Sequence, residues 1–182
     1  NSYVPCAYAW PSKFSIEIKN KFHNDLQRLI SLLGIKSSMF NVEVRISKAG
    51  VPYIMEVAPR GGGNRLAEMV RHAYGTDLIG AAVNTALGNI CDLNFEGEID
   101  GFWGEIILFS RKEGFFDSLK ISPFVEMNFL VEKDLWVERG CHVRSFSGAN
   151  DSIGTLILKF TTEEEQDYYL GNRDEWLEIK VK

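Results

Sequence analysis

The feature that most constrains the fold of this chain is an alternating segment followed by a turn and a second strand-like run. From 40 to 46, apolar Phe, Val and Ile alternate with Asn, Glu and Arg. This is the period of two of a β-strand with one apolar and one polar face. Residues 47–50 have the composition of a turn, and 52–58 have the pattern of a returning strand. The sequence therefore predicts a β-hairpin.

Two glutamates of this hairpin are predicted to face each other. If the loop is symmetric about Ala49 and Gly50, Glu43 lies directly opposite Glu56. The Cβ atoms of such a pair are ~4.5–5.5 Å apart, and two carboxylates that close repel unless a cation lies between them. Mg²⁺ prefers such oxygen ligands, completed by phosphate and water. The pair indicates a magnesium–nucleotide site; the alternative is that one glutamate faces solvent or pairs with Arg45.

A glycine-rich loop follows the second strand. Arg60 lies just past the strand end, where its guanidinium can reach phosphate oxygens with a bidentate fork. The next residues are Gly61, Gly62, Gly63, Asn64 and Arg65, and glycines let backbone N–H groups approach an anion closely. Glycine runs also occur in ordinary turns, so it is the position after an acid-bearing hairpin that indicates function.

The remaining patterns predict an α+β fold with an antiparallel sheet and packed helices. Helical spacing or capping predicts helices at 15–33, 66–73, 76–87 (with Thr76 as N-cap) and 162–170. Strands are predicted at 102–109, 115–121, 127–137, 142–146, 153–160 and 176–181. This order divides the chain into a subdomain with the hairpin, residues 1–90, and a strand-rich subdomain, residues 91–182.

Composition excludes several classes of protein. The 182 residues are 45% hydrophobic, enough for a continuous core. A net charge of -5 with scattered basic residues argues against nucleic-acid binding. No apolar run approaches the ~20 residues that cross a membrane. Cys6, Cys91 and Cys141 are odd in number and far apart, which argues against a disulfide framework and favours a reducing cytoplasm.

Four segments resemble a known family in order and spacing: 40–44 (FNVEV), 53–60 (YIMEVAPR), 75–78 (GTDL) and 86–88 (ALG). They are similar to the closing half of the ATP-grasp domain, whose superfamily includes carbamoyl phosphate synthase large subunits, biotin carboxylases and purine-pathway ligases. The resemblance is strong over residues 26–88 and looser beyond. It implies that this chain is the C-terminal part of an ATP-grasp fold.

The resemblance also implies residue roles. Glu43 and Glu56 would hold Mg²⁺, or alternatively Mn²⁺, that bridges the phosphates of ATP. Arg60 would bind the phosphates and act in catalysis, and Gly61 to Arg65 would line the substrate side. The implied reaction joins a carboxylate to an amine through an acyl phosphate. Many family members have a metal-binding Asn where this chain has Ala58, so Asn41, Asn64 or water would have to take that place.

Elements that grip ATP in this family, namely a lysine-bearing strand, a flexible glycine-rich loop and a hinge, precede the segments matched here. The chain begins at Asn1 with an abrupt apolar run, so we expect a fragment that binds ATP weakly and catalyses nothing alone. Its implied partners are ATP, a small carboxylate or amine substrate, the missing N-terminal part and, as an assembly, a homodimer. The rival hypothesis is a non-catalytic binding or assembly module of the same shape. The substrate stays open.

Overall fold

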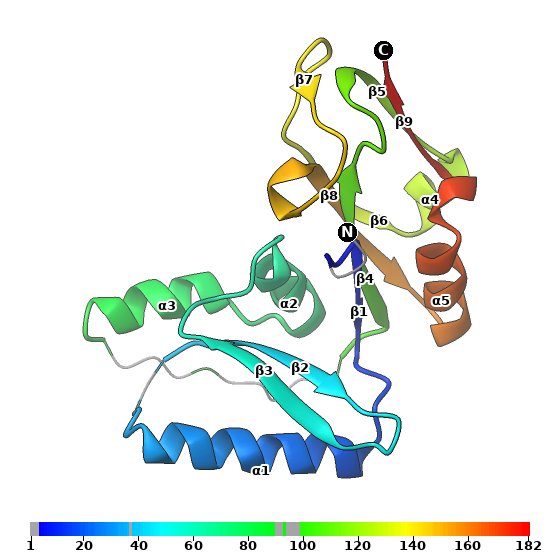
Figure 1. The fold of residues 1–182 in the computed structure, drawn as a ribbon. Coiled ribbons are helices and arrows are strands. Elements are labelled where there is room, and N and C mark those ends of the chain that lie inside the picture. Colours follow the sequence, from blue (N-terminus) through cyan, green and yellow to red (C-terminus); the bar gives the residue numbers. More distant parts are fainter. Residues whose placement is uncertain (1–3, 37, 90–92, 94–98) are drawn as a thin grey trace. The chain divides into compact units, whose positions relative to one another are not determined.

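The computed structural model describes residues 4–36, 38–89, 93 and 99–182 (Figure 1). The chain forms two compact units, Asn1–Pro11 with Ile99–Lys182, and Ser12–Glu98. We call the first the sheet unit and the second the hairpin unit. This division differs from the expected one at residue 90, because the first residues of the chain join the unit formed by the last ones. Cys91 lies outside the described residues.

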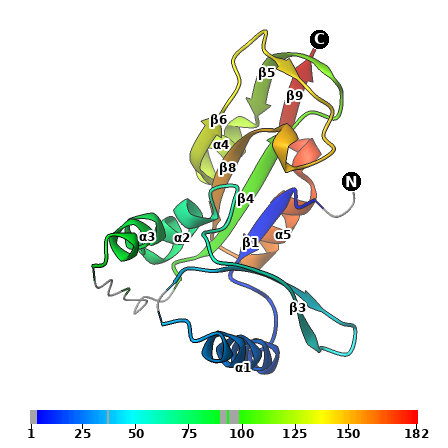
Figure 2. The same cartoon turned by 60° about the vertical axis from the view of Figure 1, so that its left-hand side comes forward.

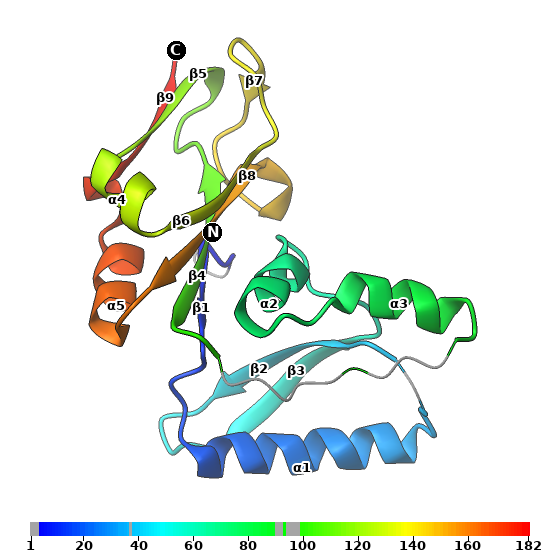
Figure 3. The same cartoon turned by 180° about the vertical axis from the view of Figure 1, so that it is seen from behind.

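The hairpin unit consists of a two-stranded hairpin with helices on both faces. In Figures 1 and 3, α1 runs along one face of the hairpin, and α2 and α3 lie over the other. Ser15 caps α1, since its side chain accepts a hydrogen bond from the N–H of Ile18. The elements are α1 (Ile16–Leu32), β2 (Asn41–Ile46), β3 (Pro52–Ala58), α2 (Leu66–Tyr74) and α3 (Leu78–Ala86).

The register of the hairpin changes along its length. Near the turn, Arg45 pairs with Tyr53, and the Ser47 N–H donates to the Val51 carbonyl at 2.9 Å. This loop is centred on Ala49, half a residue earlier than the sequence predicts, so the register near the turn differs from the predicted one by one residue. A β-bulge after Glu43 then shifts the register by one residue, so that Glu43 pairs with Glu56. The predicted pairing is confirmed, although the predicted loop centre is wrong.

The two short helices of the hairpin unit are bounded by backbone conformation and by a cap. α2 ends at Gly75, whose φ of 71° is left-handed and costs little only for glycine. Asp77 caps α3 by accepting the N–H of Gly80 at 2.9 Å. The expected N-cap, Thr76, is instead 5% exposed. An aspartate is at least as good an N-cap as a threonine. Because Thr76 is buried, its exposed neighbour Asp77 takes the capping position.

The sheet unit contains two antiparallel sheets, with strand orders β1-β4-β8-β6 and β7-β5-β9 (Figure 2). Helix α5 packs on β4, β8 and β1, and α4 packs on β6. The strands are β1 (Ala7–Trp10), β4 (Phe102–Phe109), β5 (Gly114–Ile121), β6 (Leu130–Leu135), β7 (His142–Val143), β8 (Ser152–Phe160) and β9 (Leu177–Val181). The helices are α4 (Pro123–Asn128) and α5 (Glu163–Gly171), and Arg173–Glu175 forms a 3-10 turn, η2. The predicted α+β class with antiparallel sheets is confirmed.

The apolar N-terminal segment pairs with a strand almost a hundred residues later in the sequence. β1 is antiparallel to β4, with Ala7 opposite Ile106 and Trp10 opposite Trp103. Gln166 of α5 fixes this edge, since its amide donates to the carbonyls of Trp10 at 3.0 Å and Trp103 at 2.7 Å. The side chain of Gln166 is fully buried, so these bonds replace those that its Nε2 would make with water.

Two expected strands are shorter than the sequence predicts. Residues 127–137 were expected to be extended, but α4 covers their start and β6 begins only at Leu130. Pro123 at the first helical turn sets this helix, because its fixed φ suits that position. The expected strand at 142–146 forms only His142–Val143. Thr162 caps α5 as predicted, in a capping box with Glu165.

Apolar side chains of both sheets and of α4 form one core in the sheet unit. Phe129 and Phe160 lie at its centre, with ring centroids 5.1 Å apart. Within the described residues, no helix is long and apolar enough to span a membrane. The core residues are Ile106, Leu108, Phe116, Val125, Phe129, Val143, Ile153, Leu156, Leu158, Phe160 and Trp176.

Candidate active site

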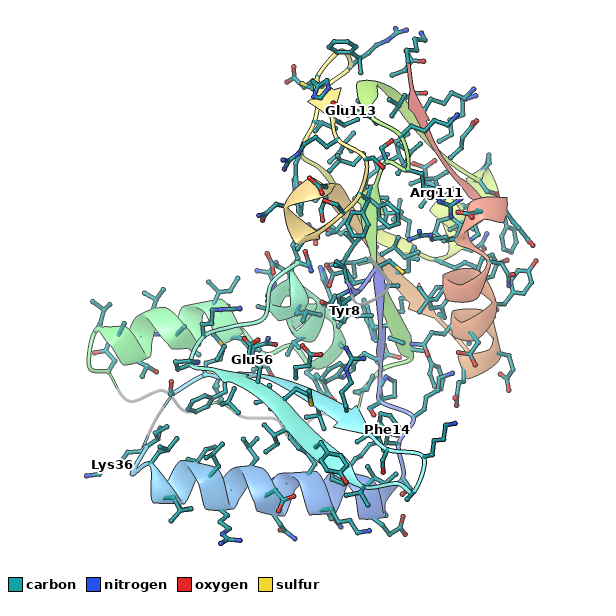
Figure 4. All side chains as sticks on the ribbon, in the orientation of Figure 1. Tyr8, Phe14, Lys36, Glu56, Arg111 and Glu113 are labelled. Atoms are coloured by element: carbon teal, nitrogen blue, oxygen red, sulfur yellow. The ribbon has the colours of Figure 1, made fainter. Side chains whose placement is uncertain are left out.

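The acid pair of the hairpin is the centre of the candidate site. Glu43 of β2 and Glu56 of β3 are directly opposite each other in an antiparallel pair, so their side chains project from the same face. Both residues are exposed, and Figure 4 labels Glu56 on β3. Without the bulge Glu43 would face Met55, so the bulge is what brings the two carboxylates together. Bulges are common next to active sites because they re-aim a side chain in this way.

Glu43 also makes the contact that was the alternative to a metal site. Its Oε1 accepts a hydrogen bond from Nη2 of Arg45 at 2.9 Å, with the two side chains 52% and 60% exposed. A pair this exposed contributes ~0–1 kcal/mol, because water screens both charges. A divalent cation placed between two carboxylates interacts far more strongly, so this ion pair is weak enough to be displaced.

Asn41 carries an amide oxygen beside the acid pair. Its partner across the hairpin is Ala58, and it projects from the same strand face as Glu43, two residues away. The small side chain of Ala58 leaves room opposite the Asn41 amide. No group of three or more His, Cys, Asp and Glu side chains that could hold a metal ion occurs among the described residues, so a metal at this pair would rely on the amide of Asn41, phosphate or water. Two carboxylates and one amide oxygen form a donor set that suits Mg²⁺, which prefers hard oxygen ligands.

Arg60 is placed at the end of β3 but is turned toward its own loop. Its N–H donates to the Ala58 carbonyl and its Nη1 to the Gly61 carbonyl, both at 2.8 Å. The residue is exposed, and only one of its five guanidinium N–H groups makes this bond. The other donors are free to meet an anion, but their contact with a phosphate stays a prediction.

The three glycines of the loop differ in how much space surrounds them. A Cβ on Gly62 would lie 2.8 Å from Leu66 Cδ1 and 3.3 Å from Asn41 Oδ1, and one on Gly61 would lie 3.0 Å from Met39 Cε. A Cβ on Gly63 would meet nothing within 4 Å. The glycine run therefore lets the loop pack against the end of the hairpin, beside Asn41. This is a packing reason, which glycine composition alone did not reveal.

The left-handed backbone falls on the two residues after the glycines. Asn64 has φ 54° and Arg65 has φ 67°. Asparagine tolerates this region, but a long side chain does so at a cost on the order of 1–3 kcal/mol, and such strain clusters at functional sites. Nε of Arg65 lies 3.3 Å from Glu68 Oε1, with the arginine side chain 16% exposed. The family resemblance predicts Arg65 on the substrate side, but the sequence gives no signal of this strain.

Comparison with known proteins places this geometry in a recognised architecture. No protein-family model matches the chain. Its structure is similar to the L-amino acid ligase of Bacillus licheniformis, with a TM-score of 0.83, 21% identity, and coverage of 99% of this chain and 45% of the ligase. It is also similar to phosphoribosylglycinamide synthetase of Anaerococcus prevotii, with a TM-score of 0.78, 22% identity, and coverage of 98% and 46%. The chain has the ATP-grasp fold of these enzymes.

The sequence itself matches carnosine synthase 1. Identity with the Gallus gallus protein is 47% over 87 residues, which are 48% of this chain and 9% of that protein. Identity with the Homo sapiens protein is 42% over 55 residues, which are 30% of this chain and 6% of that protein. The chain thus spans a small part of its curated relatives and just under half of the solved ligases. Two of these relatives are carnosine synthases, and the two solved structures are a ligase and a synthetase.

Proposed function

We propose that this chain supplies the metal-binding end of an ATP-dependent carboxylate–amine ligase. In this proposal, Glu43 and Glu56 hold the Mg²⁺ that accompanies ATP, Mn²⁺ being able to replace it, and the carboxylate is activated as an acyl phosphate. The observation that carries the proposal is the direct pairing of Glu43 with Glu56 through a bulge in an otherwise regular hairpin. Two exposed carboxylates held together without a cation repel each other, so a metal explains why this geometry forms.

Asn41 completes the metal site in this proposal. It lies opposite Ala58, where many members of the family have an asparagine, so the amide reaches the site from the neighbouring strand. The metal supplies charge neutralisation to the phosphates when it is bound. The protein residues then position it: two carboxylates from two strands and one amide from β2 fix the ion against the hairpin.

Arg60 and the loop that follows serve the anionic groups of the reaction. Arg60 would leave the Gly61 carbonyl and stabilise charge that grows on the transferring phosphoryl group. Arg65 caps α2 without a side-chain hydrogen bond to the first turn. The Leu66 N–H donates to the Gly63 carbonyl, and the N–H groups that follow it in the first turn would receive an anion such as a substrate carboxylate. Gly61, Gly62, Gly63 and Asn64 would line that side.

An amino acid is the substrate we favour, because the L-amino acid ligase named above shares the fold over 99% of this chain. One neighbour, the biotin carboxylase domain of a Hydrogenobacter thermophilus carboxylase, is described in complex with MgADP and bicarbonate, at a TM-score of 0.72. That description supports nucleotide and magnesium use here. A preceding N-terminal part of the same protein, a homodimer and a cytoplasmic location stay predictions.

The test is Glu56→Gln in the complete protein, compared with Glu17→Gln on the exposed start of α1. A neutral amide at 56 removes one of two anionic ligands, so turnover should fall by at least about a thousandfold while the unfolding midpoint is unchanged. Arg60→Ala should lower kcat by ~10²–10³-fold with a smaller change in nucleotide affinity. Glu17→Gln should leave steady-state kinetics unaltered. Near-normal turnover for Glu56→Gln would show that the reaction of the complete protein does not need Glu56, and would favour a non-catalytic binding role for this chain.

A further inference from the structure

A second candidate binding site lies within the sheet unit, and its argument does not depend on the ligase proposal. A cavity of about 630 Å³ opens beside β4, β9 and η2, which is within the range of small-molecule sites. Its apolar lining comes from Ile107, Phe109, Leu177, Ile179 and Val181. Its polar lining includes Arg111, Lys112, Asp117, Arg173, Asp174 and Glu178.

Most charges around this cavity are already paired. Asp117 accepts hydrogen bonds from Lys182 and Arg139, each at 2.9 Å, and these ion pairs lower the pKa of its carboxyl. Asp174 Oδ2 accepts from Arg111 at 2.6 Å, and Glu178 lies 3.6 Å from Lys180. Figure 4 labels Arg111, which belongs to the turn between β4 and β5. The three acids of the lining thus each have a basic partner.

Arg173 differs from these paired residues. Its guanidinium carbon lies 4.4 Å from the centre of the Phe109 ring, and Phe109 itself stacks on Phe146 at 4.1 Å. One face of the guanidinium is therefore held by a cation–π contact, and its N–H groups point along the plane of the group. The side chain is only 17% exposed. The aromatic stack fixes it in the cavity wall at a defined orientation.

The N–H donors of Arg173 lack acceptors at hydrogen-bond distance among the described residues. The nearest carboxylate oxygen, Asp174 Oδ1, is 3.8 Å from Arg173 Nε, and the other oxygen of Asp174 accepts a hydrogen bond from Arg111. A largely buried guanidinium with unmade hydrogen bonds is unfavourable unless a ligand or water supplies acceptors. Lys112 adds a second cation to the lining that no described carboxylate neutralises.

We propose that this cavity binds a small aliphatic carboxylate, with Arg173 as the anchor of the carboxylate group. The planar fork of an arginine matches the two oxygens of a carboxylate. Ile107, Leu177 and Ile179 provide an apolar floor for an aliphatic body, which a bare inorganic anion would not use. Lys112 contributes long-range attraction. The site is built from the sheet unit alone and is separate in sequence from the acid-bearing hairpin.

The experiment is a titration of the 182-residue chain with hexanoate, acetate and inorganic phosphate, followed by two-dimensional amide NMR. Hexanoate should shift the amides of residues 173–179 saturably with a Kd on the order of 1 mM, and acetate and phosphate should bind at least about tenfold more weakly. Equal affinity for all three would overturn the role of the apolar floor. An absence of saturable shifts with hexanoate would overturn the site.

Variants then test the anchor. Arg173→Gln should weaken hexanoate binding at least about tenfold, since it removes a charged two-point contact. Arg173→Lys retains the charge without the fork and should lose a smaller factor, and Lys112→Gln should lose about threefold or less. The control, Arg144→Gln, removes an arginine of the same unit that pairs with Asp151 outside the cavity, and it should bind as the parent does. Unchanged binding by Arg173→Gln and Arg173→Lys, with native spectra, would contradict the proposal.

Discussion

The sheet unit and the hairpin unit bury their apolar side chains to very different extents. Of the described residues, fourteen apolar ones are buried in the sheet unit, but only Pro52, Met69, Ala73 and Ala81 in the hairpin unit. The hairpin unit also leaves Ile79, Val83 and Leu87 exposed at a spacing of four along α3. Each buried large side chain contributes roughly 1.5–3 kcal/mol. The sheet unit is therefore stabilised by its own core. The hairpin unit holds the candidate site but has few buried apolar side chains to stabilise it.

This contrast predicts that stability and activity respond to substitutions in different units. A substitution in the core of the sheet unit should lower stability without changing the candidate active site. A residue of the hairpin face or its loop should affect metal binding while costing little stability, because its side chain is exposed. The following predictions test this separation in order of decreasing effect.

Phe160→Ala should destabilise the sheet unit by about 3–5 kcal/mol, because it deletes a fully buried ring that contacts Phe129 and Tyr169. The matched substitution in the hairpin unit, Met55→Ala, removes a side chain that is 61% exposed and should change stability by less than about 0.5 kcal/mol. Urea unfolding followed by residue-resolved NMR measures both units separately. Similar losses for the two variants would remove the contrast between the units.

Asn41→Ala should weaken Mn²⁺ binding by about tenfold, because the proposed site loses its neutral oxygen ligand. Adding Ala58→Asn should restore the affinity, since residue 58 lies directly opposite residue 41 on the neighbouring strand. Electron paramagnetic resonance of Mn²⁺ titrated into the 182-residue chain measures the free ion. If Asn41→Ala binds Mn²⁺ as well as the parent does, the ligand role of Asn41 is wrong.

Gly62→Ala should destabilise the loop and the start of α2 by about 1 kcal/mol, because its Cβ would lie 2.8 Å and 3.2 Å from two atoms of Leu66. Gly63→Ala is the control, since a Cβ there meets nothing within 4 Å, and it should change stability by less than about 0.5 kcal/mol. Hydrogen exchange of the α2 amides reports the local effect. Equal protection in the two variants would show that the glycines are interchangeable.

Asp151→Asn should make the stability of the sheet unit depend less strongly on pH in the acid range. Hydrogen bonds from the Ser147 side chain and N–H, the charge of Arg144 and the Gly148 N–H lower the pKa of Asp151 below its ordinary 3.8. Its stabilisation is therefore present above that value and is lost as the pH falls through the lowered folded pKa. Thermal midpoints measured from about pH 5 to pH 2 should fall less steeply in the variant. Parallel curves would exclude this contribution.

The sequence by itself determined most elements of the chain, because local patterns carry their own physical cause. Alternation at period two gave the strands β2 and β3, helical spacing gave α1, and the Thr162 capping box gave the start of α5. The predicted face of Glu43 followed from the same alternation. The resemblance to ATP-grasp enzymes was also local, since it rests on short segments with fixed spacing.

The tertiary structure decided what depends on residues distant in sequence or on small shifts in register. β1 pairs with β4, and Gln166 donates hydrogen bonds to both strands. No local sequence pattern shows this pairing, because the three segments are far apart in the sequence. The sequence reached the Glu43–Glu56 pair by assuming a loop centre that is wrong by half a residue, and a bulge restores the predicted register at the two acids. A register follows from the sum of all cross-strand contacts, and one inserted residue turns every later side chain to the other face. For that reason the two acids could be identified from the sequence, but the bulge that sets them opposite each other is visible only in the folded hairpin.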